Sequence, residues 1–184
     1  MNLIASPGQL RASYLRWALV CVPAVVLLGF VSGQVAQSGP DNLWFAALTK
    51  PALYPPPLTF PIVWTVLYVM MGLALAQILA ARGARGRGAA AIAFAVQFAL
   101  NLAWTPVFFA AHRITAALAV IVALDLAVVV TIVLFRRVRP GAALLLVPYL
   151  LWVLFATYLT FSILTANPAA DGAAGPSAVQ RFQI

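Results

Sequence analysis

The chain has 184 residues, of which 65% are hydrophobic and only 8% are charged. Soluble domains carry roughly 45–50% apolar and about 25% charged residues, so this composition excludes a water-soluble globular protein. It also excludes an intrinsically disordered chain, because disorder requires low hydrophobicity. Cys21 is the single cysteine, which excludes disulfide scaffolds and cysteine-rich zinc or redox sites. The meaning of the net charge of +8 depends on where the charges lie.

Five long apolar runs predict five membrane-spanning helices. Each run holds close to the ~20 residues that a helix needs to cross about 30 Å of hydrocarbon. Helices are the expected form because each backbone polar group in lipid must be satisfied within its own segment. The predicted helices cover residues 17–35, 61–81, 89–111, 114–135 and 141–166. The first run also resembles a secretory signal, but it is longer than most signal cores, and we interpret it as a retained helix.

We therefore expect one all-α domain over residues 1–166, a five-transmembrane-helix bundle with an ordered loop between its first two helices. That loop, residues 37–60, contains several aromatic residues and the run Pro55-Pro56-Pro57, and prolines restrict the backbone. A long loop of this kind is usually functional or disordered, and its aromatic content argues against disorder. We expect it to form a lid over the mouth of the bundle. The Ala/Gly/Pro-rich segment 167–184 is expected to be a flexible tail.

The basic residues mark one side of the membrane. Eight of the eleven lie before the first helix, in the link 82–88 or in the link 136–139, and five helices place these segments on the same side. Because Lys/Arg-rich loops stay in the cytoplasm, we predict a cytoplasmic N-terminus in a bacterial cell membrane. An outer or organellar membrane is the alternative, and there the rule could mislead. No basic patch outside the membrane has interleaved aromatic residues, so nucleic acid is not expected as a partner.

Two polar residues fall inside predicted spans. Asp125 is the only carboxylate in a span; an acid in lipid is costly and by default functional, but a hydrogen-bonded clamp between two helices explains it equally well. Asn101 needs a hydrogen-bond partner on another helix or on a ligand. The only histidine, His112, lies at a helix end and is interpreted as interfacial. No cluster of metal ligands is visible, and no cofactor is expected to be required.

Several aromatic residues lie deeper in the spans than the interfacial belts in which membrane proteins usually place Trp and Tyr. Trp64 and Tyr68 are four residues apart, and Trp104 follows Asn101 by three, so each pair shares a helix face. Core packing explains any single tryptophan well. Taken together, these residues favour an aromatic pocket with one or two polar anchors. The last helix adds one stripe to this set: Trp152, Ala156 and Leu159.

Small residues recur every four positions along the third predicted helix, at Ala91, Ala95, Ala99 and Ala103. Such stripes let two helices approach closely in lipid, and we predict that this one forms a homodimer interface. A contact within the bundle is the alternative. The first helix shows the same spacing at Gly29 and Gly33.

Several motifs together resemble a known family. The loop reads Trp44-Phe45-Ala46-Ala47-Leu48-Thr49-Lys50-Pro51, the third helix reads Asn101-Leu102-Ala103-Trp104-Thr105-Pro106, and the last reads Val147-Pro148-Tyr149-Leu150-Leu151-Trp152. In this order and with this helix count, residues 17–166 resemble the tryptophan-rich sensory protein family (TspO/MBR), also called the translocator protein or peripheral benzodiazepine receptor family.

The resemblance implies a five-helix bundle, often dimeric, that binds porphyrins and other hydrophobic small molecules in a pocket under the first loop. Lys50 is a candidate contact for the anionic propionates of a porphyrin. If the light-dependent porphyrin chemistry proposed for some members occurs here, Trp64 and Trp152 would carry it; otherwise no catalytic residue is expected. Carried over by position, the ligand-binding residues would be Phe45, Pro55, Trp64, Tyr68, Asn101, Trp104, Trp152, Ala156 and Leu159.

We interpret the chain as a receptor-like membrane protein that binds porphyrin or heme and has a sensory or regulatory role in tetrapyrrole metabolism or stress response. A porphyrin transporter, with Asp125 as a coupling site, and a light-dependent porphyrin-degrading enzyme are the alternatives. Two positions depart from the family pattern. Leu53 stands where an aromatic residue is common, and no basic residue follows Tyr158 closely, so specific cholesterol binding is not expected.

Overall fold

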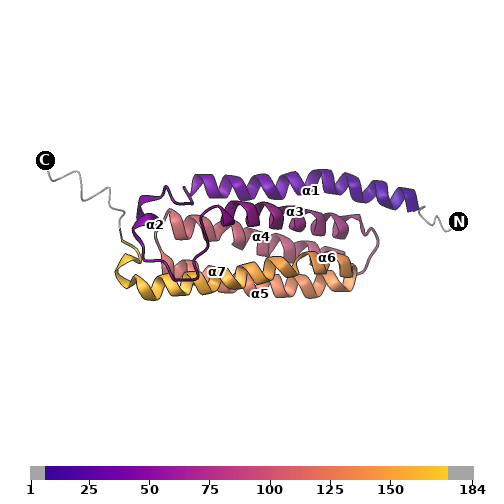
Figure 1. Ribbon diagram of the computed structural model, residues 1–184. Helices are drawn as coiled ribbons and strands as arrows, with labels where there is room; N and C mark the ends of the chain where they lie inside the picture. Colours follow the sequence, from indigo (N-terminus) through magenta and orange to yellow (C-terminus); the bar gives the residue numbers. More distant parts are fainter. Residues whose placement is uncertain (1–6, 174–184) are drawn as a thin grey trace.

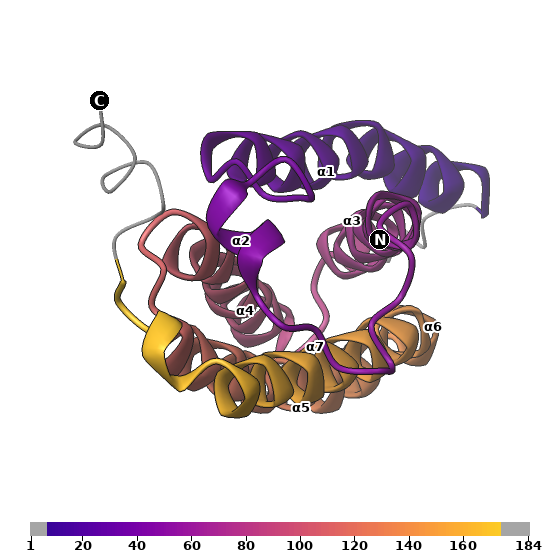
Figure 2. The same cartoon turned by 60° about the vertical axis from the view of Figure 1, so that its left-hand side comes forward.

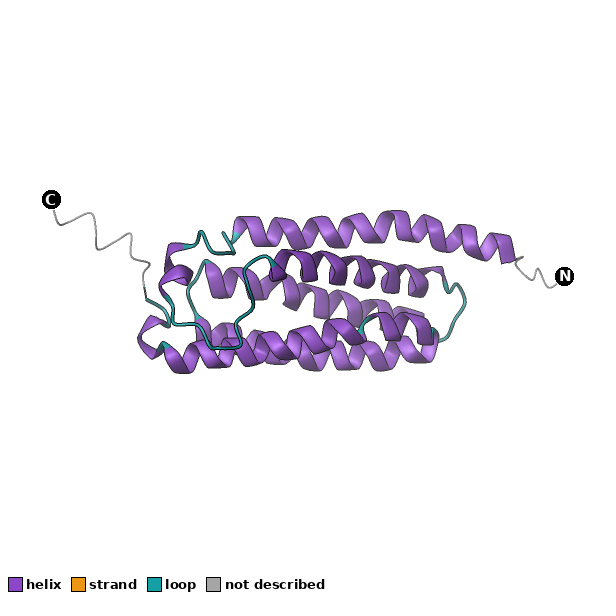
Figure 3. Cartoon of the chain, in the orientation of Figure 1, coloured by secondary structure: helices purple, strands orange, loops and turns teal. Residues whose placement is uncertain are grey.

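The computed structural model describes residues 7–173, which contain helices and no strand (Figures 1 and 3). The α-helices are α1 (Pro7–Val35), α2 (Leu43–Ala47), α3 (Thr59–Ala80), α4 (Arg87–Phe109), α5 (Ile114–Val138), α6 (Pro140–Leu145) and α7 (Val147–Ala166), and a 3₁₀-helix, η1, covers Pro168–Ala170. With α6 and α7 counted as one span, five segments of this part are long and apolar enough to cross a membrane. The prediction of an all-α bundle of five membrane-spanning helices is therefore confirmed.

The two ends of the bundle differ in character (Figure 1). At one end, α2 and the loops beside it cross the opening of the ring of helices (Figure 2). We call this the lid end, and η1 follows α7 there. The other end holds the first turns of α1, the α3–α4 link with the start of α4, and the last turn of α5 with the residue that follows it. We call it the basic end because eight arginines belong to these segments.

Helix α1 begins at Pro7, ten residues before the predicted start of the first span. Proline fits the first turn of a helix because its missing N–H has no intrahelical partner there. The helix has 29 residues and is roughly 43 Å long at 1.5 Å per residue, which exceeds the ~30 Å of hydrocarbon. Hydrophobicity marks only the part that lies in lipid, so it could not reveal the polar first turns that carry Arg11 and Arg16.

The fifth span is interrupted. Helix α6 ends at Leu145 and α7 begins at Val147, because Pro148 has no N–H to continue the helical pattern. Part of the segment predicted to be a flexible tail is ordered. Residues 167–173 are tied down by hydrogen bonds, including one from the Gly172 N–H to the carbonyl of His112 (2.8 Å). Residues 174–184 of the predicted tail lie outside the described residues.

Glycines allow α1 to pack closely against α3. A Cβ on Gly72 would lie 2.6 Å from the Cα of Val22, and a Cβ on Gly29 would lie 2.2 Å from the ring of Tyr68. Both distances are far inside ordinary carbon contact of about 3.5–4.0 Å. These positions therefore set how near the two helices come. Gly29 thus makes a contact within the bundle, which is the alternative to a dimer interface that the sequence left open.

Helix α4 contains Pro106, which cannot donate to the carbonyl of Leu102 one turn earlier. In lipid such a free carbonyl must find another donor. The Ser32 hydroxyl of α1 supplies it at 2.8 Å. This bond joins α1 to α4 one residue from Asn101, near the middle of the lid-end half of the bundle.

The outer surface of the helices is apolar. Leu19, Val35 and Leu126 are 65–76% exposed, and many other large aliphatic side chains are more than half exposed. A surface of this size would be unfavourable in water but matches the acyl chains of a bilayer. Polar residues such as Gln97, Asn101 and Thr160 are buried inside instead.

Candidate functional site

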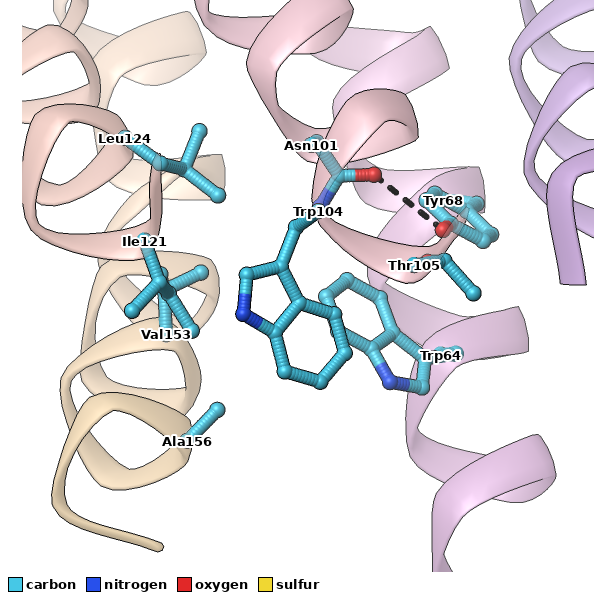
Figure 4. A pocket seen from close by; sticks show the side chains of 9 residues that line it. All are labelled: Trp64, Tyr68, Asn101, Trp104, Thr105, Ile121, Leu124, Val153 and Ala156. Carbon is cyan, nitrogen blue, oxygen red and sulfur yellow. Dashed lines mark hydrogen bonds between the residues drawn. The ribbon is translucent and has the colours of Figure 1, made fainter. Parts of the chain in front are cut away.

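A cavity lies inside the lid-end half of the bundle, between α3, α4, α5 and α7 (Figure 4). Its walls are mostly apolar, and its polar groups come from Tyr68, Asn101, Thr105 and the indole N–H of Trp104. The volume open to the centre of a water molecule is about 20 Å³, which is room for little more than one water. The residues that line it are Trp64, Tyr68, Asn101, Trp104, Thr105, Ile121, Leu124, Val153 and Ala156.

A buried polar pair forms one side of the cavity. The Tyr68 hydroxyl donates to Oδ1 of Asn101 at 3.2 Å, joining α3 to α4 (Figure 4). Trp64 stacks on the Tyr68 ring with centroids 5.2 Å apart. Gly29 lies against the other part of that ring, so α1 supports it from behind. The three contacts hold the Tyr68 ring in one position.

Trp104 has an indole N–H with no partner. Its Nε1 is buried and makes no hydrogen bond within the described residues. Figure 4 shows this nitrogen directed to the side of the cavity where Ile121 and Val153 lie. The Trp104 ring stacks on Phe108 at 5.2 Å. A buried N–H without an acceptor is costly, so a ligand or water that offers an oxygen here gains a hydrogen bond.

The lid is held to the bundle by Asn42. Its Oδ1 accepts from the Phe45 N–H at 3.0 Å and so caps α2. Its Nδ2 donates to the carbonyl of Phe109, at the end of α4, at 3.1 Å. Trp44 and Phe45 then turn inward and are buried, and the Phe45 ring meets the Phe109 ring at 5.0 Å.

Residues after α7 hold the lid from the other side. The side chain of Asn167 accepts from the Thr49 N–H at 2.8 Å and donates to the Thr49 carbonyl at 2.9 Å. The same segment is also bound to α5. Asp171 accepts hydrogen bonds from the hydroxyl and the N–H of Thr115, in the first turn of that helix. The Thr115 hydroxyl lowers the pKa of Asp171 below its ordinary value. An acid at this position also suits the positive end of the α5 dipole.

Lys50 bonds within the lid itself. Its ammonium donates to the carbonyls of Phe45, Ala46 and Leu48 at 2.8–3.3 Å and lies 4.7 Å from the centre of the Phe45 ring. Desolvation lowers the pKa of Lys50 from its ordinary value. An ammonium has three N–H groups, and three carbonyls occupy them. A contact with an anionic ligand, as predicted, would have to replace one of these bonds.

Aromatic rings connect the lid to α7. The ring centroid of Tyr54 lies 6.0 Å from that of Phe45 and 5.2 Å from that of Phe60, and the centroids of Phe60 and Trp152 lie 5.9 Å apart. Trp152 thus meets Phe60 in the first turn of α3 and packs against the bundle core, and it is not among the residues that line the cavity. Its indole Nε1 is buried without a hydrogen-bond partner in the described part of the chain.

The structure brings together part of the predicted ligand-binding set. Trp64, Tyr68, Asn101, Trp104 and Ala156 line the cavity. The other predicted residues do not line it: Phe45 belongs to the lid, Trp152 meets Phe60 of α3, and Pro55 and Leu159 lie elsewhere. Sequence reasoning missed four residues of the lining, Thr105, Ile121, Leu124 and Val153. Thr105 could have been predicted, because it is a polar residue one turn after Asn101 and directly after Trp104, the two candidates in the same helix.

Asp125 is buried outside the cavity lining. Its Oδ2 accepts from the Thr157 hydroxyl at 2.8 Å, which joins α5 to α7. This is the geometry of the clamp between two helices. Its Oδ1 is buried with no partner among the described residues, so the acid keeps one free acceptor. The neighbouring residues Leu124 and Ala156 do line the cavity.

Two other predicted features have a defined place. The stripe Ala91, Ala95, Ala99 and Ala103 lies on the outer surface, where its last three members are exposed. His112 stacks on Trp44 with ring centroids 4.5 Å apart, at the lid end. Among residues 7–173, no group of three or more His, Cys, Asp or Glu side chains could hold a metal ion.

Comparison with known proteins places this cavity in a known family context. The sequence profile of the TspO/MBR family matches residues 19–165, a range that includes every residue of the cavity lining. The tryptophan-rich protein TspO of Chlorobaculum tepidum is 41% identical over 150 residues, which is 81% of this chain and 94% of the relative. Protein CrtK of Rhodobacter capsulatus is 39% identical over 68% of this chain and 79% of its own. The translocator protein of Homo sapiens is 34% identical over 76% and 84%.

Proposed function

The chain belongs to the TspO/MBR family of integral, multi-pass membrane proteins, and from this premise we propose that it binds porphyrins and other flat hydrophobic molecules. The binding site is the cavity between α3, α4, α5 and α7. The role is that of a receptor that senses tetrapyrroles, in their metabolism or in stress. The names of two relatives, "Tryptophan-rich sensory protein" and "Translocator protein", agree with a sensory or ligand-handling role.

The observation that carries the proposal is a pair of tryptophans from different helices that line one cavity beside a polar pair. Trp64 and Trp104 offer ring faces on which a flat macrocycle can stack, and each aromatic pair contributes about 0.5–1.5 kcal/mol beyond area burial. The unpaired N–H of Trp104 and the Tyr68–Asn101 pair offer hydrogen bonds that orient the ligand. This combination of apolar walls and few polar groups is typical of small-molecule sites.

The cavity must open before such a ligand can enter. Ligand pockets are commonly about 300–1,000 Å³, whereas this cavity has about 20 Å³ open to the centre of a water molecule. Trp104 packs both against the bundle core and against the aromatic cluster under the lid. We infer that the lid lifts and Trp104 turns when ligand binds.

We further propose the orientation and assembly expected from the sequence. The basic end faces the cytoplasm of a bacterial cell, because eight arginines lie there and lipid-facing surface lies between the two ends. Two copies associate through the α4 alanine stripe. Its exposure on the outer surface supports this interface, because small residues let the two helices approach closely.

The test is quenching of intrinsic tryptophan fluorescence by protoporphyrin IX in detergent micelles, kept in the dark. We compare the wild type with Trp64→Leu and Trp104→Leu, which remove the aromatic face, and use Trp17→Leu as the matched control because Trp17 lies on α1 at the basic end. Each cavity variant is expected to raise the Kd by about 2–12-fold, which corresponds to the stacking energy of one aromatic pair. The control should stay within about twofold.

Two results would count against the proposal. Quenching that does not saturate at micromolar porphyrin would remove specific binding, and an equal Kd in all four proteins would place the ligand outside this cavity. The same samples can be illuminated. Loss of porphyrin absorbance that requires Trp64 would favour the light-dependent enzyme instead, although Trp152, the other tryptophan predicted for that chemistry, does not line the cavity.

A further inference from the structure

A second hollow lies at the basic end, outside the bundle core. It is formed by one stripe of α1 and by Arg82, which follows the end of α3. The stripe is Ser13, Arg16, Trp17 and Val20, whose spacing of three, four and seven residues places them on one helix face. The volume open to the centre of a water molecule is about 250 Å³, much more than in the cavity under the lid.

Position along α1 sets the depth of this hollow in the membrane. The uncharged part of α1 begins at Trp17 and its 19 residues to Val35 span about 28 Å, close to the thickness of the hydrocarbon. Trp17 therefore lies at the boundary, where membrane proteins place tryptophan. Arg16 lies one residue further out, at the level of the lipid headgroups, and Val20 lies one turn further in, beside the acyl chains.

The arginines of this hollow have no acidic side chain as a partner within residues 7–173. The sequence has three acidic residues; Asp41 and Asp171 belong to the lid end and Asp125 lies within the α5 span. Arg16 donates only one N–H, from Nε to the carbonyl of Ala12 at 3.2 Å. Both Arg16 and Arg82 are exposed. Two exposed guanidinium groups thus border one hollow with no acidic side chain of the described residues beside them, so their charge is available to an anion.

We propose that this hollow binds the phosphate of one anionic phospholipid from the leaflet at the basic end. Arg16 and Arg82 bind the phosphate oxygens, because guanidinium groups match them in geometry and charge. The Ser13 hydroxyl donates to the headgroup, Trp17 packs on the glycerol region, and the first acyl chain follows Val20 along α1. Leu19, which is 75% exposed, continues the apolar surface beside this path.

The hollow differs from a general attraction between a basic surface and an anionic membrane. Basic residues near such a surface each attract it by about 1 kcal/mol wherever they lie, whereas a built site depends on two particular arginines. Arg11 and Arg85 allow the distinction, because they belong to the same two segments of the chain and are exposed, but do not border the hollow.

The experiment is native mass spectrometry of the full chain in detergent, titrated with phosphatidylglycerol or phosphatidylcholine. We expect the wild type to retain one phosphatidylglycerol in preference to phosphatidylcholine. The double variant R16Q/R82Q should bind phosphatidylglycerol at least tenfold more weakly. The control R11Q/R85Q removes the same charge and should stay within about twofold. Circular dichroism checks that the variants fold, and if R16Q/R82Q does not, each single variant should show about fivefold weaker binding.

Three outcomes would overturn the proposal. Equal weakening in the two double variants would mean diffuse charge attraction without a site. Equal affinity for the two lipids in the wild type would mean that no headgroup is recognised. Displacement of phosphatidylglycerol by an equal concentration of inorganic phosphate would mean that the hollow takes free phosphate, with no contribution from the acyl chains.

Discussion

Gly29→Ala tests whether the contact between α1 and Tyr68 supports the cavity. The added Cβ would lie 2.2 Å from Cε2 of Tyr68, so the ring or α1 has to move by more than 1 Å to reach ordinary contact of about 3.5–4.0 Å. Tyr68 donates to Asn101 at 3.2 Å, and a movement of that size breaks the bond. Overpacking costs about 1–3 kcal/mol and a lost hydrogen bond about 1 kcal/mol more. Helix propensity offsets up to about 1 kcal/mol of this.

Gly33→Ala is the matched control. It makes the same change one turn later on the same helix and gains the same propensity, but its Cβ would lie 3.1 Å from the Ser38 hydroxyl, which is free to rotate away. We expect this variant to be neutral or slightly more stable than the wild type. The propensity gain cancels between the two variants, so their free energies of unfolding should differ by about 2–4 kcal/mol.

Cys21 provides the assay. It is the sole cysteine, lies on α1 and is 5% exposed, so a thiol-reactive dye labels it only when α1 separates or the bundle unfolds. During heating, Gly29→Ala should be labelled at a lower temperature than the wild type, and Gly33→Ala should not. In a Tyr68→Leu background the cost of Gly29→Ala should fall, because the atoms it meets are gone. Equal labelling temperatures for the two glycine variants would refute the reasoning.

Two more predictions concern single hydrogen bonds. Ser32→Ala should lower the free energy of unfolding by about 0.6–1 kcal/mol, because it removes the donor to the Leu102 carbonyl. In a Pro106→Ala background, where α4 regains a backbone donor for that carbonyl, the cost should be smaller. Equal costs in the two backgrounds, measured by thiol labelling, would contradict this. Asp171→Asn should remove an acid-sensitive contact. Because the pKa of Asp171 is lowered on folding, its stabilisation is complete above about pH 3.9 and is lost as the pH falls through the folded-state pKa. Between pH 6 and pH 3 the midpoint temperature of unfolding of the wild type, measured by circular dichroism, should approach that of the variant, and a constant difference would count against this role.

The sequence predicted those residues of the site whose side chains are unlike the aliphatic residues that usually face lipid. Asn101 is polar in an apolar span, and Trp64, Tyr68 and Trp104 are larger and deeper than a lipid-facing position requires, so their spacing was enough to place them inward. The structure puts all four in the cavity lining. The helix number follows from the same contrast, because a run of uncharged residues either reaches about 20 or does not.

The other lining residues could not be predicted from the sequence, because the protein core and the lipid are both apolar and favour the same side chains. Helix α7 is apolar on every side, so nothing in its pattern shows which residue faces the cavity. Val153 lines it, whereas its neighbour Trp152, one residue away and about 100° around the helix, meets Phe60 in the first turn of α3. The role of Lys50 was equally hidden, since only the fold brings three carbonyls of α2 and its end to one ammonium.

The closed cavity and the lid are coupled by one side chain. Trp104 packs against the core cluster and also against the cluster formed by Trp44, Phe45 and Phe108 under the lid. The helical walls are held by close contacts along their length, as at Gly72, whereas the lid is held at its edges by the side chains of Asn42 and Asn167. Separating helices would therefore cost more than releasing the lid. A ligand that displaces Trp104 from the cavity disturbs the lid cluster at the same time. Binding in the buried cavity would then change the conformation of the lid at the membrane surface.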